Sequence, residues 1–256
     1  MLALVPQVMK QAMDRYEDMF VQRGSAYDRA MRRLPQARAA EFAQVIARAD
    51  MRSGQVVADV PAGGGYLRGF LPAGVAWVGH EPCASFQGGQ HGASSSGRPL
   101  LPFPWEDASM DRVICLAGLH HQEDKIPFHS EARRVLRPSG RYVLSDVPAD
   151  SPVAAFLDGF IGAHNSTGHS GTYLDGRTQS ELSAAGLRIV SDELVRFLWI
   201  FRDVSELGEF CHGLFDLRTA SPRSVAEAAA EQLGVEVVPE GVGLRWELRT
   251  VVATTA

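Results

Sequence analysis

The stretch VVADVPAGGGY, residues 56–66, passes from an apolar run directly into three glycines. Glycine adds no side chain to the core, but it adopts left-handed backbone conformations and lets a ligand approach the main chain closely. An apolar run that ends at an acidic residue, here Asp59, and then turns through glycines is typical of a buried strand that leads into a ligand site. We therefore expect a binding site at the carboxyl end of this strand.

The rest of the chain favours an α/β fold in one domain. Four short runs rich in valine and isoleucine, VVADV, WVGHE, RVICLA and RYVLSDV, suit strands that are buried on both faces of a parallel sheet. With 256 residues, 45% of them hydrophobic, the chain can bury a sizeable core. We expect a single domain over residues 1–256, in which residues 1–50 form a helical lid, residues 51–150 the ligand-binding core and residues 151–256 the remaining elements.

Charge and cysteine content exclude several classes of partner and site. The formal net charge of −5 shows no basic excess that would neutralise phosphates, so we expect a small molecule and no nucleic acid as the partner. The three scattered cysteines form no CxxC pair and indicate neither a disulfide framework nor a structural zinc site. The N-terminus does not resemble a signal peptide, and no apolar run has membrane-spanning length. We expect a cytoplasmic protein without a membrane partner, and the oligomeric state stays open.

A second acidic residue narrows the ligand. The run WVGHE ends at Glu81, which follows Asp59 by about 20 residues, the spacing of a carboxylate that binds ribose hydroxyls. A nucleoside-containing ligand is therefore expected, whereas the turn taken alone would equally fit a plain tight turn. A nicotinamide-dependent reductase is disfavoured, because Pro61 stands where the first glycine of GxGxxG would be and the chain has no Tyr-x-x-x-Lys pair.

Three segments resemble one family in the family's own order. Asp59, Gly63 and Gly65 match the DxGxGxG motif of class I (Rossmann-like) S-adenosylmethionine-dependent methyltransferases. Residues 101–121, LPFPWEDASMDRVICLAGLHH, and residues 131–147, EARRVLRPSGRYVLSDV, are similar to segments of the type 11 small-molecule methyltransferases. The resemblance implies a seven-stranded, mostly parallel sheet with helices on both faces, an N-terminal helical lid, and helical insertions after the fifth and sixth strands.

The resemblance also assigns a cofactor, S-adenosylmethionine, with S-adenosylhomocysteine as product. It implies that Glu81 binds the ribose, with Pro82 beside the adenine, and that Tyr27 belongs to the lid. The remaining cofactor contacts that it implies are Asp59, Ala62, Gly63, Gly64 and Gly65 in the turn, and Leu116 and Ala117 after the fourth strand. Two features depart from the family: Pro61 has no N–H to donate, and residues 82–100, where the adenine contacts are expected, are shortened.

The loop AHNSTGHSGTYLD, residues 163–175, contributes the candidate catalytic residues. His169 and His164 lie where this fold places its methyl acceptor, and either is expected to orient or deprotonate the acceptor. His120 and His121 are interpreted as a structural end to the fourth strand, and no metal site is expected because no HExxH-like pair occurs. The predicted function is methyl transfer to an O, N or C atom of a small molecule; the alternative is a catalytically silent protein of the same fold that binds a nucleoside or a partner protein.

Overall fold

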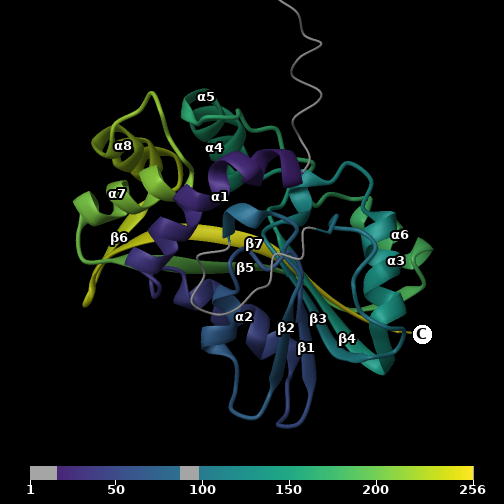
Figure 1. Cartoon of the computed structure of the whole chain (residues 1–256). Helices are drawn as coiled ribbons and strands as arrows, with labels where there is room; N and C mark the ends of the chain where they lie inside the picture. The colour runs from purple at the N-terminus through teal and green to yellow at the C-terminus, as the bar shows by residue number, and fades with distance from the viewer. Residues whose placement is uncertain (1–15, 87–97, 256) are drawn as a thin grey trace, which may run out of the picture.

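The computed structural model describes residues 16–86 and 98–255. In these residues one seven-stranded sheet has the order β2-β1-β3-β4-β7-β5, and β6 pairs with β7 at one end (Figure 1). The strands are β1 (Val56–Asp59), β2 (Ala76–Gly79), β3 (Met110–Leu116), β4 (Leu136–Asp146), β5 (Leu187–Phe201), β6 (Val235–Val238) and β7 (Gly241–Thr255). The pairs among β1 to β4 are parallel, whereas β7 is antiparallel to β4, β5 and β6. Only β7 therefore runs against the other strands, which confirms the predicted mostly parallel sheet.

Helices cover both faces of the sheet, as expected. They are α1 (Tyr16–Arg33), α2 (Ala39–Ala49), α3 (Ile126–Val135), α4 (Pro152–Phe156), α5 (Gly162–His164), α6 (Thr178–Ala184), α7 (Val204–Leu214) and α8 (Pro222–Gln232). A π-helical turn, Leu157–Ile161, joins α4 to α5. The helices α4 to α6 follow β4, and α7 and α8 follow β5. These are the fifth and sixth strands in the family's count, because no strand lies between β2 and β3 in the part of the chain that the structure describes, so the helices lie at the two predicted insertion points. No described helix has the length and apolar character that a membrane crossing requires.

Alternating residues of the central strands supply two separate hydrophobic cores. Val57, Ile114 and Val143 face a core that includes residues of α2, α7 and α8. Their sequence neighbours Ala58 and Val113 face the opposite core, to which α3 and α6 contribute. This alternation is the two-residue period of a strand that is buried on both faces, so the apolar runs read from the sequence are explained.

Two local features distinguish the segments on either side of β2. The glycine turn leads only into a short 3₁₀ helix, Tyr66–Phe70, because Pro72 follows closely and β2 begins at Ala76. Between β2 and β3, the described residues contain no strand; residues 87–97 of the shortened segment lie outside the described part of the chain.

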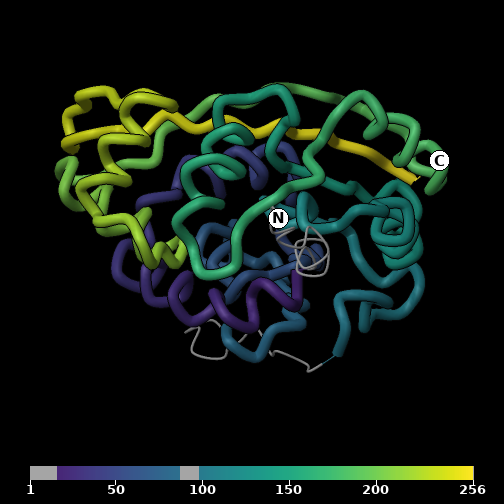
Figure 2. Tube along the Cα trace, turned by 90° about the horizontal axis from the view of Figure 1, so that it is seen from above, coloured from purple at the N-terminus to yellow at the C-terminus, as the bar shows by residue number. Residues whose placement is uncertain are grey.

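The long antiparallel pair β5 and β7 extends one side of the sheet. The two strands are hydrogen-bonded from Leu187 to Phe201 and run side by side in Figure 2. At the carboxyl ends of β1, β3 and β4, α1, α4 and α5 lie over the sheet (Figure 1). In an open α/β sheet these strand ends are the usual place for a ligand.

Candidate active site

The glycine turn has a backbone that other residues adopt only with strain. Gly63, Gly64 and Gly65 have φ angles of +52°, +92° and +78°. The turn is tied to β2 because the Ala62 N–H donates to the His80 carbonyl at 3.0 Å. A Cβ placed on Gly63 would meet only the Tyr27 hydroxyl, 3.9 Å away. The main chain at Gly63 therefore faces open space, which a side chain would fill.

Glu81 lies directly against this turn. Its carboxylate is fully buried and accepts hydrogen bonds from the Gly63 N–H at 2.8 Å, the Tyr16 hydroxyl at 2.7 Å and the Cys83 N–H at 2.9 Å. Burial raises the pKa of Glu81 to about 7, although these three donors oppose the shift. A carboxylate offers about four acceptor positions, so about one remains for a ligand hydroxyl.

Two further predicted cofactor residues belong to this part of the site: Asp59, which ends β1, and Pro82, which follows Glu81. The Asp59 carboxylate is 3% exposed and accepts a hydrogen bond of 3.2 Å from the Trp77 indole N–H. Burial and the neighbouring Glu81 raise the pKa of Asp59 well above its usual value, and the bond from Trp77 opposes this. Pro82 is half-buried. Two carboxyl groups are thus held out of water at the end of β1 and β2.

Two tyrosines of α1 lie over the turn. Tyr27 stands above Gly63, and its hydroxyl accepts a 2.6 Å hydrogen bond from Arg38. Tyr16 is 2% exposed and contacts Glu81, as described above. The structure therefore brings the predicted lid residue Tyr27 to the turn, and it adds Tyr16, which the sequence analysis missed.

The end of β3 supplies the opposite wall. Ala117 has a φ of +50°, an uncommon value for a residue with a side chain, and its N–H donates to the Ser145 carbonyl at 2.8 Å. Ala117 lines a cavity, whereas Leu116 is half-buried in the core beside it. Strained residues of this kind gather at ligand sites.

The cavity that Ala117 lines has a volume of about 70 Å³. It is lined by Phe20, Arg23, Tyr27, Arg38, Glu41, Ala117, His120, His121, Val147, Leu157, His169, Trp199, Leu214, Phe215 and Trp246. We call it the histidine-lined cavity. Its residues come from α1, α2, the π-helical turn, the loops after β3, β4 and α5, the end of α7 and the strands β5 and β7. The carboxyl end of the sheet and α1 therefore meet here.

The structure separates the two candidate catalytic histidines. His169 lines the cavity, is 9% exposed, and its Nδ1 lies 2.7 Å from Asp158 Oδ1. Burial lowers the pKa of His169 to about 4, although Asp158 opposes the shift. His164 is not among the cavity residues; its Nδ1 lies 2.8 Å from the Thr219 hydroxyl. Of the two, only His169 faces the space beside the turn.

His120 and His121 also line the cavity, although the sequence analysis interpreted them as structural. His120 is 6% exposed, and its Nδ1 lies 2.7 Å from Asp146 Oδ1. Asp146 ends β4 and also accepts the backbone N–H groups of Leu119 and His120. The pair therefore both closes the strand end and presents two imidazoles to the cavity.

Charged and aromatic residues of the cavity were missed as well. Arg38 and Glu41 form a buried ion pair at 2.6 Å, and Glu41 accepts the Trp199 indole N–H at 2.8 Å. Arg23 is 4% exposed, and its Nε has no hydrogen-bond partner among the described residues. The helical spacing of α1 could indicate its buried face, but no local pattern shows that an arginine on that face is buried.

The chain matches a known family within its central part. Residues 95–144 match the methyltransferase domain family. Over 46 residues the chain is 46% identical to the 27-O-demethylrifamycin SV methyltransferase of Amycolatopsis mediterranei. That alignment covers 18% of this chain and 17% of the relative, so it spans about a sixth of the relative's length.

Solved structures share the fold at low identity. A S-adenosylmethionine-dependent methyltransferase of Thermotoga maritima superposes with a TM-score of 0.59 at 13% identity, covering 94% of this chain and all of that one. Phosphoethanolamine N-methyltransferase 2 of Haemonchus contortus superposes with a TM-score of 0.59 at 9% sequence identity. The match covers 94% of this chain and 60% of that one. The [4+2]-cyclase SpnF superposes with a TM-score of 0.54 at 18% sequence identity. The match covers 85% of this chain and 81% of that one. The chain therefore has the fold of the class I S-adenosylmethionine-dependent methyltransferases, and its residues 95–144 match the methyltransferase domain family.

Proposed function

We propose that this chain binds S-adenosylmethionine at the Asp59–Gly65 turn and transfers its methyl group to an O, N or C atom of a small molecule in the histidine-lined cavity. One observation carries the proposal: a buried carboxylate, Glu81, lies 2.8 Å from the N–H of a turn that leaves its main chain open to a ligand. The site fits this cofactor, because ribose hydroxyls need a carboxylate acceptor and the methionyl chain needs a backbone without Cβ atoms.

The bound cofactor would supply a methyl group on a positively charged sulfur. Glu81 would hold the ribose end, while Ala62 to Gly65, Leu116 and Ala117 would line the methionyl end and Pro82 the adenine. Tyr27, from α1, would cover the turn and exclude water. In a closed, desolvated site of this kind, most of the acceleration comes from holding the two reactants in line.

His169 is the residue we assign to the acceptor. Its Nδ1 is directed to Asp158, so the hydrogen lies on that nitrogen and Nε2 is left as an acceptor. Nε2 can orient an acceptor hydroxyl or amine, or take its proton. His164 is bonded to Thr219 outside the cavity, so it is the weaker candidate of the two.

Two measurements test the proposed function in sequence. Calorimetry with S-adenosylmethionine and S-adenosylhomocysteine should show binding that Gly63→Val abolishes, because a side chain there fills the open space above the turn. Release of S-adenosylhomocysteine with a panel of small hydroxyl and amine acceptors then separates a methyltransferase from a silent binder. Normal binding by Gly63→Val would contradict the assigned cofactor site.

A further inference from the structure

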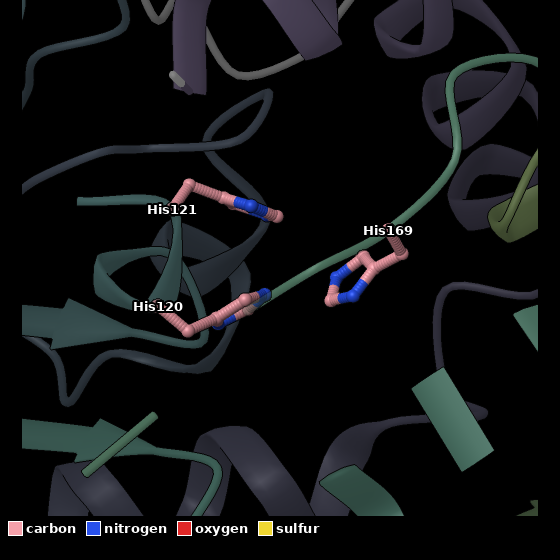
Figure 3. A group of neighbouring side chains, drawn as sticks. All are labelled: His120, His121 and His169. Atoms are coloured by element: carbon pink, nitrogen blue, oxygen red, sulfur yellow. The ribbon is translucent and has the colours of Figure 1, made fainter. Parts of the chain in front are cut away.

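Three imidazoles meet in the histidine-lined cavity from segments that are far apart in the sequence. His120 and His121 belong to a short 3₁₀ helix, Leu119–His121, after β3, and His169 reaches toward them from the loop after α5 (Figure 3). The ring centroids are 4.0 Å apart for His120 and His121, and 5.5 Å and 5.4 Å from His169. One ring nitrogen of each residue lies within 4.8 Å of those of the other two. All three side chains are at least nine-tenths buried.

Two of the rings are oriented by carboxylates from behind. Asp146 lies 2.7 Å from His120 Nδ1, and Asp158 lies 2.7 Å from His169 Nδ1. Each carboxylate fixes the hydrogen on Nδ1 and leaves the Nε2 lone pair directed away from it. A histidine that ligates a metal is commonly held by a carboxylate in this way.

The third ring has a nitrogen that the protein leaves without a partner. His121 is 4% exposed, and its buried Nδ1 has no hydrogen bond among the described residues. A buried polar atom without a partner is destabilising, so such atoms commonly have an external ligand.

We propose that His120, His121 and His169 bind a divalent transition-metal cation of the zinc type. Three imidazoles with an open fourth position form the ligand set of a catalytic zinc site. Nitrogens around a tetrahedral zinc lie about 3.3 Å apart, so the rings must draw together by about 1.5 Å at most.

The charges around the cluster favour a cation. Asp146 and Asp158 place two carboxylates directly behind the ligands, and Arg23 is the neighbouring cation on the cavity wall. Arg38 is neutralised by Glu41 at 2.6 Å. Lys125 also interacts electrostatically with Asp146, and Asp216 with Arg23, so three carboxylates face two cations around the cluster and offset part of the added charge.

A bound cation would also change the role of His169 toward the methyl acceptor. This step rests on the proposed function. The cavity that the three rings share offers space for a fourth ligand, which an oxygen or nitrogen atom of the methyl acceptor would supply. His169 would then orient the acceptor through the cation. Cation binding itself does not depend on methyl transfer and can be measured alone.

The test uses the full chain, without a histidine tag, after chelator treatment. Titration with Zn²⁺, and with Co²⁺ for its visible spectrum, should show one tight site with the bands of four-coordinate Co²⁺. His121→Ala and His169→Ala should abolish this site, and Asp158→Asn should weaken it by about 10- to 100-fold. His212→Ala, on α7 and outside the cluster, is the matched control and should bind Zn²⁺ as the wild type does.

Thermal unfolding shows whether a variant lacks the metal site or has failed to fold. Zn²⁺ should raise the Tm of the wild type and of His212→Ala but not that of His121→Ala, because only a ligand of the folded state stabilises it. Without Zn²⁺, His121→Ala should unfold at or below the wild-type temperature, because it removes a buried ring that packs on Phe20 and His120 and leaves a cavity, so the comparison is the shift in Tm that Zn²⁺ causes in each protein. Absence of a tight site in the wild type, or its retention in His121→Ala and His169→Ala, would overturn the proposal. Binding of S-adenosylmethionine, measured on the same samples, reports separately on the proposed function.

Discussion

The two halves of the candidate site are built differently. The cofactor side, Asp59 to Glu81, is one stretch of about 20 residues in which a turn and a carboxylate meet directly, 2.8 Å apart. The proposed acceptor side, the histidine-lined cavity, is formed by residues that range from Phe20 to Trp246 in the sequence. A compact stretch fixes its geometry through local backbone, whereas the cavity depends on how α1, the loop after α5 and the sheet pack together.

Substitutions on the two sides should therefore change different measured quantities. A change on the cofactor side should alter cofactor affinity, since Glu81 and Gly63 would touch the ligand directly. A change at His169 should alter turnover and leave cofactor affinity intact, because the ring faces the cavity and not the turn. The predictions below test whether the two sides separate in this way.

The largest effect is expected at His169. His169→Ala removes the imidazole that we assign to the acceptor and should lower turnover by about 100-fold or more, while cofactor affinity stays within about twofold. Steady-state rates with an identified acceptor, together with calorimetry, measure the two quantities.

His164→Ala is the matched control, because His164 lies five residues earlier but bonds to Thr219 outside the cavity. Its turnover should stay close to that of the wild type. Equal losses of turnover in both variants would show that the whole loop affects turnover. They would contradict a specific role for His169 in the cavity.

A smaller effect is expected at Glu81. Glu81→Ala should weaken S-adenosylmethionine binding by about 1–3 kcal/mol, which is about 5- to 150-fold, because charge-assisted hydrogen bonds to the ribose are lost. Glu123→Ala, a change at an exposed carboxylate, is the control and should bind normally. Undiminished affinity in Glu81→Ala would refute the ribose assignment.

The sequence predicted what depends on short-range pattern. Short runs rich in valine and isoleucine identified the central strands, and the glycines and the spacing to Glu81 located the turn, whose positive φ angles the structure shows. The cavity could not be predicted, because His120 and His169 are far apart in the chain and no periodicity links them. Nor could a pattern show that a loop histidine is buried against Asp158 while another, five residues earlier, is not.

The pH dependence of cofactor binding also tests the cofactor side, with a smaller expected effect. Burial raises the pKa of Glu81 to about 7, so the free protein takes up a proton there as the pH falls through 7. The ribose hydroxyls need the ionised form, so cofactor affinity should be highest above pH 7 and fall by up to about tenfold per unit below it. Calorimetry from pH 6 to 8 measures this, and Glu81→Gln should remove the dependence. The same slope in Glu81→Gln would assign the titration to another group.

The smallest effect concerns Tyr16, which links the lid to the cofactor side. Its hydroxyl donates to the same Glu81 oxygen as the Gly63 N–H does, and so competes with a ribose hydroxyl for that carboxylate. Tyr16→Phe keeps the ring and its packing on Phe20 but removes the competitor, so cofactor affinity should rise by about 2- to 10-fold, the range of one net hydrogen bond. The bond from Tyr16 also holds down the pKa of Glu81, so the comparison belongs at a series of pH values from 8 upward, where the ionised fraction of the carboxylate rises in both proteins. Tyr142→Phe, on β4 in the opposite core, should leave affinity unchanged. Weaker binding by Tyr16→Phe would show instead that α1 and the ribose share Glu81, so that the lid is part of the bound site and the cofactor side is less local than its sequence suggests.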